Sequence, residues 1–127
     1  MKRTTLFAAV LMAVAAAVSG PALADGDAAK GKKVFNKCKA CHVADEAKNK
    51  VGPSLHGVFG RKAGTVEGFK YSDAMKESGG EWSEETLAEY GKKPKEFIPG
   101  NKMAFAGIRK DDQIEDLIAF LKEETVK

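Results

Sequence analysis

The clearest hydrophobic pattern lies near the C-terminus, where apolar residues recur at i, i+3, i+4 and i+7: Ile114, Leu117, Ile118 and Leu121. This spacing predicts an amphipathic helix. Asp111 and Asp112 fall at its start and Lys122 near its end, an arrangement that suits the helix dipole. Its apolar face requires a second element to bury it.

A second helical repeat begins after Asp27, a suitable N-cap, and runs through Ala28, Gly31, Phe35 and Cys38. We expect a short helix here that crosses the C-terminal one. Gly31 lacks a side chain and would let the two backbones approach closely. Phe35 would then pack near Leu117 and Phe120.

The middle of the chain predicts two shorter helices, over 72–78 and 83–90, and no strands. Residues 43–70 contain five glycines and show neither a helical nor a strand period. A loop of that length is unusual in a compact domain. A chain wrapped around a flat apolar cofactor would explain it, so the fold class is all-α with long loops around a cofactor.

Two cysteines three positions apart are followed at once by a histidine, in the segment Cys38-Lys39-Ala40-Cys41-His42. This is the attachment motif of c-type haem. Each thiol can form a thioether with one haem vinyl group, and the imidazole of His42 can bind the iron. The motif predicts one covalently attached haem c per chain.

Other interpretations of these five residues fit less well. A thiol redox motif would need a preceding strand and a βαβ unit. A structural zinc site needs four ligands, and only His42 and the distant His56 could join the two cysteines. A structural disulfide suits an exported chain but leaves His42 without a role.

The first 24 residues resemble a secretory signal, with Lys2 and Arg3, an apolar run over 6–18, and an A-x-A cleavage site over 22–24. We expect removal of 1–24, export to the periplasm, and a single domain over 25–127. Cleavage reduces the formal charge from +3 to +1, which does not favour nucleic-acid binding. No later segment is long and apolar enough to span a membrane.

The second iron ligand could come from His56, Met75 or Met103. Met103 is favoured because it lies in the segment 98–107 between predicted helices, where a flexible thioether could reach inward. From the residues alone, a core-filling role for Met103 remains open.

Over 25–127 the chain resembles the class I c-type cytochromes and is similar to bacterial cytochrome c-two and mitochondrial cytochrome c. The resemblance rests on the Cys38–His42 motif and on further segments in family order: 51–57, 60–62, 68–73, Trp82, Tyr90 and the Met103 loop. It implies the small fold in which the N- and C-terminal helices cross and two or three short helices and long loops surround the haem. It also implies that Met103 is the sixth iron ligand.

The same resemblance implies further roles around the cofactor. Pro53 is expected to accept a hydrogen bond from His42 through its carbonyl, and the Tyr90 hydroxyl to contact the Met103 sulfur. Three side chains are expected near the haem propionates: Arg61, Tyr71 and Trp82. Asn101 departs from the family pattern, in which threonine is commoner at this position, and the change is expected to affect propionate or water bonding. His56 is expected to bridge loops as a structural residue.

A site with both axial positions filled carries electrons and leaves no place for substrate. The resemblance therefore implies a single-electron carrier, not an enzyme. It would be a monomer passing electrons from a membrane quinol-oxidising cytochrome complex to a terminal oxidase or photosynthetic reaction centre. Lysines around the haem edge would form the docking face: Lys37, Lys39, Lys92, Lys93, Lys95, Lys102 and Lys110. The alternative is a haem peroxidase or small-gas sensor, which would require that Met103 does not bind iron.

Overall fold

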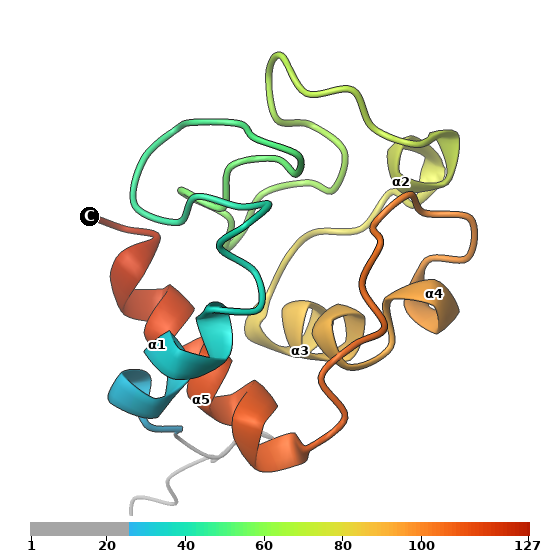
Figure 1. The fold of residues 1–127 in the computed structure, drawn as a ribbon. Coiled ribbons are helices and arrows are strands. Elements are labelled where there is room, and N and C mark those ends of the chain that lie inside the picture. The colour runs from blue at the N-terminus through green and yellow to red at the C-terminus, as the bar shows by residue number, and fades with distance from the viewer. Residues whose placement is uncertain (1–25) are drawn as a thin grey trace, which may run out of the picture.

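A computed structural model describes residues 26–127, and the predicted signal peptide over 1–24 lies outside the described residues. Five helices follow one another (Figure 1): α1 (Ala28–Phe35), α2 (Asp73–Glu77), α3 (Glu84–Lys92), α4 (Pro94–Phe97) and α5 (Asp111–Glu124). Within 26–127 there is no strand, only two isolated antiparallel bridges. The predicted all-α class is confirmed.

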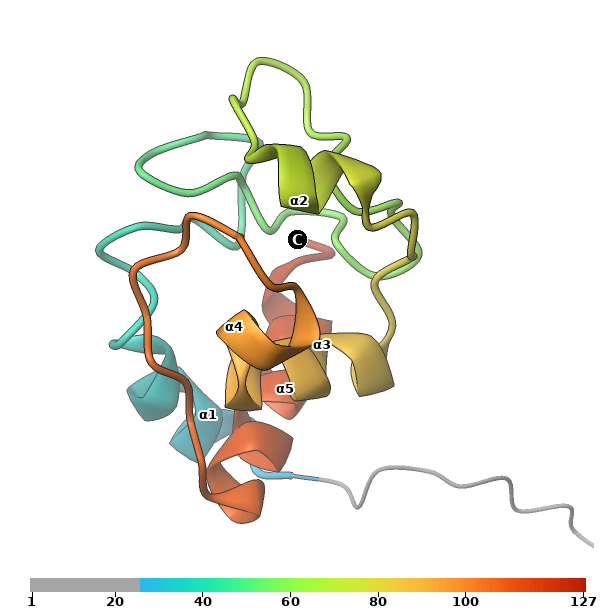
Figure 2. The ribbon, with the colours of Figure 1, turned by 90° about the vertical axis from the view of Figure 1, so that its right-hand side faces the viewer.

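The crossing of the N- and C-terminal helices is also confirmed, and it is visible in both ribbon views (Figures 1 and 2). Asp27 caps α1 by accepting a hydrogen bond from Lys30 N at 3.1 Å. At Gly31, a Cβ atom would lie 1.9 Å from the carbonyl oxygen of Asp116 in α5, so the crossing excludes any side chain there. The rings of Phe35 and Phe120 pack with their centroids 5.3 Å apart.

The middle helices lie close to their predicted positions. Ser72 and Ser83 are the N-caps of α2 and α3, and each side chain accepts a hydrogen bond from the backbone N–H three residues ahead. α3 continues two residues beyond the predicted end, to Lys92. The short helix α4 starts at Pro94, whose fixed φ suits the first helical position. With α2 and α3 it makes three short helices, in agreement with the predicted two or three.

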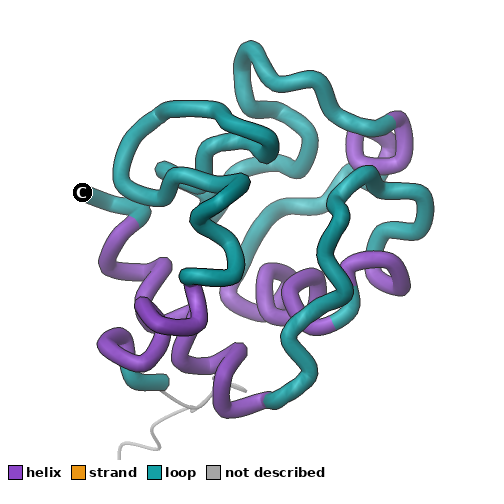
Figure 3. The backbone as a smooth tube through the Cα atoms, viewed as in Figure 1, coloured by secondary structure: helices purple, strands orange, loops and turns teal. Residues whose placement is uncertain are grey.

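Loops make up much of the molecule away from the α1/α5 pair (Figure 3). We call residues 43–70 and 99–110 the loop region. Its first part folds back on the segment after α1 through a backbone hydrogen bond from Gly52 N to Cys41 O at 2.8 Å. A second pairing joins Trp82 N to Arg61 O at 2.8 Å.

Two clusters of buried apolar side chains form the core. The first gathers around α1 and α5, and the second around Val58, Tyr71, Met75 and Trp82. Three half-buried side chains pack against both clusters: Leu55, Phe59 and Leu87. None of the helices within 26–127 is both long and apolar enough to cross a membrane.

Candidate functional site

The Cys38–His42 segment follows α1 as a series of tight turns. Cys38 N donates to Phe35 O at 2.8 Å, and His42 N donates to Cys38 O at 2.9 Å. Both cysteines are half-buried and form no disulfide. Burial raises the pKa of Cys38 to about 11, the neighbouring Cys41 adds to this rise, and Lys37 opposes it. The thiol of Cys38 is therefore protonated at neutral pH until it is modified.

His42 is held in one orientation. Its Nδ1 lies 2.8 Å from the carbonyl oxygen of Pro53, which can only accept, so Nδ1 carries the proton and Nε2 keeps its lone pair. Burial lowers the pKa of His42, the Pro53 bond raises it and Arg61 lowers it further. The ring is thus neutral near pH 7, the form that binds a metal.

Gly52 supplies the space for this ring. A Cβ atom there would lie 2.3 Å from Cε1 of His42, and Gly52 N donates to Cys41 O at 2.8 Å. Sequence reasoning missed this contact. The glycine next to Pro53 was visible in the sequence, but its closeness to His42 depends on how the loop folds back.

Arg61 has an unsatisfied donor. Its two terminal nitrogens donate to His56 O at 3.2 Å and Ser54 O at 3.0 Å, whereas its buried Nε has no partner among the described residues. Burial lowers the pKa of Arg61, and the interaction with Tyr71 opposes the shift. A half-buried guanidinium whose buried Nε–H has no partner suits an anionic group such as a propionate.

The expected aromatic residues gather in and around the second core cluster. The Tyr71 hydroxyl accepts a hydrogen bond from Val66 N at 3.0 Å and keeps its own proton available to donate. The rings of Trp82 and Tyr90 lie 5.1 Å apart, and Tyr90 also packs against Phe97 at 6.3 Å. Burial raises the pKa of Tyr90 to about 12, so its hydroxyl stays protonated at neutral pH.

Met103 lies half-buried in the extended loop between α4 and α5, which Figures 1 and 2 place on the same side of the molecule as the segment after α1. Its backbone N donates to Oδ1 of Asn101 at 2.9 Å. Among the described residues, no hydrogen bond joins the Tyr90 hydroxyl to the Met103 sulfur, so the expected contact stays a prediction.

The other two candidate ligands have different surroundings. Nε2 of His56 lies 2.9 Å from the carbonyl oxygen of Lys127, which ties the loop to the C-terminus. This agrees with the structural role that the resemblance implies. Met75 is buried in the second core cluster, and its backbone N bonds to Ser72.

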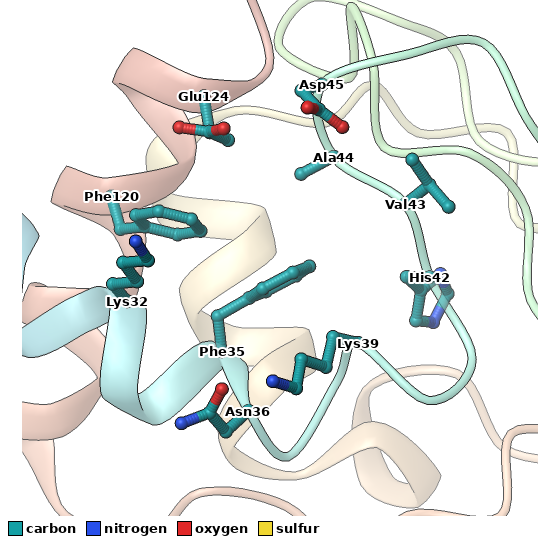
Figure 4. Close-up of a pocket in the computed structure, with 10 residues that line it drawn as sticks. All are labelled: Lys32, Phe35, Asn36, Lys39, His42, Val43, Ala44, Asp45, Phe120 and Glu124. Carbon is teal, nitrogen blue, oxygen red and sulfur yellow. The ribbon is translucent and has the colours of Figure 1, made fainter.

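An open hollow of about 300 Å³ lies between α1, α5 and the segment after His42 (Figure 4). Phe35 and Phe120 contribute apolar walls, Lys32 and Lys39 contribute positive charge, and Glu124 contributes negative charge. Of the predicted site residues only His42 borders it, so this hollow is not the predicted haem site.

The residues around His42 fit a haem in three respects. Two unpaired cysteines precede an oriented neutral imidazole, Arg61 keeps a buried free donor, and the three side chains shared by both clusters retain apolar surface that a flat ring could cover. The chain therefore offers attachment, ligation, charge neutralisation and burial.

Comparison with known proteins decides the family, because the cytochrome c family model matches residues 28–124. The chain belongs to the cytochrome c family. It is 53% identical over 111 residues to cytochrome c2 of Blastochloris viridis, covering 87% of each chain. It is 52% identical over 99 residues to cytochrome c-550 of Nitrobacter winogradskyi, covering 77% of this chain and 91% of that protein.

The solved structure of cytochrome cH from Methylobacterium extorquens has the same fold, with a TM-score of 0.73 and 47% identity over 77% of this chain and 99% of that chain. The class I cytochrome c fold predicted from the sequence is thus confirmed. The cofactor of this chain is covalently attached haem c, as in the rest of the family. The two cysteines are those of the attachment motif.

Proposed function

We propose that residues 25–127, after removal of 1–24, form a monomeric single-electron carrier of the bacterial periplasm. Members of the cytochrome c family are electron carriers, which supports this role in place of an enzymatic one. Two of the similar proteins are named cytochrome c2 and cytochrome c-550 and come from bacteria.

The orientation of His42 carries the proposal. Pro53 fixes the proton on Nδ1 at 2.8 Å, so Nε2 is available as an axial ligand at the position that follows Cys41. Cys38 and Cys41 form the two thioethers. Met103, from the loop between α4 and α5, would supply the second iron ligand, and its soft sulfur would favour ferrous iron.

Bound haem supplies a one-electron couple between Fe(III) and Fe(II). The chain contributes ligation, burial and neutralisation of the propionate charge. Arg61, Tyr71 and Trp82 donate to the propionates, and Tyr90 directs its hydroxyl to the Met103 sulfur. With both axial positions held by protein, the site excludes substrate and oxygen and passes electrons only.

We assign docking to the lysines of the segments around the proposed haem edge. Lys37, Lys39, Lys95, Lys102 and Lys110 are exposed. Two further lysines of the set have acidic neighbours, because Lys92 pairs with Asp111 and Lys93 lies 3.5 Å from Glu96. The partners are a membrane quinol-oxidising cytochrome complex and a terminal oxidase or photosynthetic reaction centre.

A redox titration of purified holoprotein, followed by its spectrum, tests this function. We expect a reversible one-electron transition at positive potential and the weak ferric charge-transfer band that reports sulfur on iron. Met103→Ala should keep covalent haem but lose the band, lower the potential and admit peroxide. If the unmodified protein lacks the band and has a negative midpoint, the alternative of a peroxidase or gas sensor replaces this proposal.

A further inference from the structure

Asn101 is buried, with 7% of its surface exposed, and all three of its side-chain hydrogen bonds go to backbone groups. Its Nδ2 donates to the carbonyl oxygens of Pro94 and Ile98, each at 2.8 Å. Its Oδ1 accepts from Met103 N at 2.9 Å. Because two partners are carbonyls and the third is an N–H, the orientation of the amide group is fixed.

These bonds connect α4 to the loop that carries Met103. α4 is a single short turn over Pro94–Phe97, and Asn101 bonds to carbonyls at its start and just after its end. Across residues 102–107, the described structure records one hydrogen bond only, the bond from Met103 N to Asn101. The hydrogen bonding that holds the backbone of Met103 to α4 therefore passes through Asn101.

We propose that Asn101 is a positioning residue for Met103: it anchors the backbone of this residue to α4 and so limits how readily the thioether can leave the iron. This rests on the proposed ligation by Met103. It also differs from the propionate or water bonding that the family resemblance implies, because both Nδ2 hydrogens are directed to backbone carbonyls. A long, flexible methionine side chain keeps a ligand position only if its backbone is held.

Exogenous imidazole provides the test, because it competes with Met103 for the ferric iron at constant neutral pH. We would titrate imidazole into the ferric holoprotein and follow loss of the sulfur-to-iron band. In Asn101→Ala, the half-saturating imidazole concentration should fall about tenfold, the equivalent of one net hydrogen bond. In Asn101→Ser the half-saturating imidazole concentration should fall less, because the serine hydroxyl can still accept a hydrogen bond from Met103 N but cannot reach both carbonyls.

Thr125→Val is the matched control. Thr125 is fully buried, and its hydroxyl donates to Leu121 O at 2.6 Å at the end of α5, far along the chain from Met103. Denaturant unfolding, measured in parallel, reports the stability loss of each variant. We expect Thr125→Val to lose stability yet keep the half-saturating concentration of the unmodified protein.

The outcomes separate the two proposals. If the unmodified ferric protein shows no sulfur-to-iron band, ligation by Met103 itself is wrong. If the band is present but Asn101→Ala and Thr125→Val bind imidazole equally, the positioning role is overturned and general loosening explains the result. If Asn101→Ala yields no holoprotein with attached haem, the comparison of Asn101→Ser with Thr125→Val decides the test.

Discussion

The α1/α5 pair and the loop region are stabilised in different ways. In the pair, Ile114 and Leu117 are almost fully buried and the two helices cross at Gly31 with their backbones in contact. In the loop region, side chains bind backbone groups: Asn49 Oδ1 accepts from Ser54 N at 2.9 Å, and Ser54 Oγ donates to Glu46 O at 2.6 Å.

Backbone conformation shows the same contrast. Four glycines of residues 43–70 have positive φ angles between +69° and +86°: Gly57, Gly60, Gly64 and Gly68. The helices contain none. A loop path with so many left-handed residues has no regular backbone ladder of its own, so its stability comes from side-chain hydrogen bonds and from the groups packed against it. We therefore expect the helix pair to depend on apolar packing and the loop region to depend more strongly on bound haem.

The largest expected effect comes from preventing haem attachment. The double change Cys38→Ala and Cys41→Ala should leave a chain that is largely disordered, with the loop region losing order most completely, because the haem supplies the missing core of a small domain. Far-UV circular dichroism and hydrogen exchange would measure both effects. A well-folded apoprotein with a cooperative thermal transition would show that haem is not the core.

Gly31→Ala should break the helix pair without touching the haem ligands. Its Cβ would lie 1.9 Å from Asp116 O, a contact that only a shift of the backbone can relieve. We expect a loss of about 3 kcal/mol in the free energy of unfolding. Alanine normally stabilises a helix relative to glycine, so a loss of stability in Gly31→Ala would itself indicate the close contact between the two helices.

Gly80→Ala serves as the control for this change, because its Cβ would meet nothing within 4 Å. It should be neutral or slightly stabilising in the same denaturant titration. Equal stability of the Gly31→Ala and Gly80→Ala proteins would mean that the helices do not cross as closely as the structure shows.

Gly52→Ala should destabilise the loop region less than Gly31→Ala destabilises the helix pair. Its Cβ would lie 2.3 Å from Cε1 of His42, but an imidazole ring can tilt, so we expect a smaller stability loss than at Gly31. Tilting would weaken the 2.8 Å bond to Pro53 and lower the basicity of the ligand. The readout is the redox potential together with the ferric spectrum, and an unchanged potential would contradict the predicted role of this glycine.

Changes in surface charge should leave the stability of both regions unaltered. They should change only the rate at which the protein meets its redox partner. Changing Lys37, Lys39 and Lys95 to Glu should slow electron transfer to a membrane redox partner and flatten its dependence on ionic strength. The potential should hardly move, because exposed charges are screened by solvent.

The control for the charge change alters three exposed lysines of other segments to Glu, at Lys30, Lys48 and Lys76. It matches the total charge without involving Lys122, which already pairs with Glu84 at 2.6 Å. Stopped-flow rates over a salt series would compare the two proteins. Equal slowing would show that only net charge matters and that no docking face exists.

The sequence by itself was sufficient for the helix pair and for the cofactor. The apolar spacing of Ile114, Leu117, Ile118 and Leu121 is periodic and local, so it predicts a helix without knowledge of the fold. The haem motif is equally local, because attachment needs two thiols and an imidazole within five residues. The cap at Asp27 follows from a short-range rule of the same kind.

Tertiary structure alone decided the contacts between distant loop segments. The space that Gly52 leaves for His42, the buried free Nε of Arg61 and the bonds from Asn101 to Pro94 and Ile98 join residues that share no repeat in the sequence. Such contacts depend on φ angles that glycines permit but do not specify, and on side chains that bond to backbone groups. Periodicity cannot encode them, because irregular chain has no period, and they become visible only once the loops are folded.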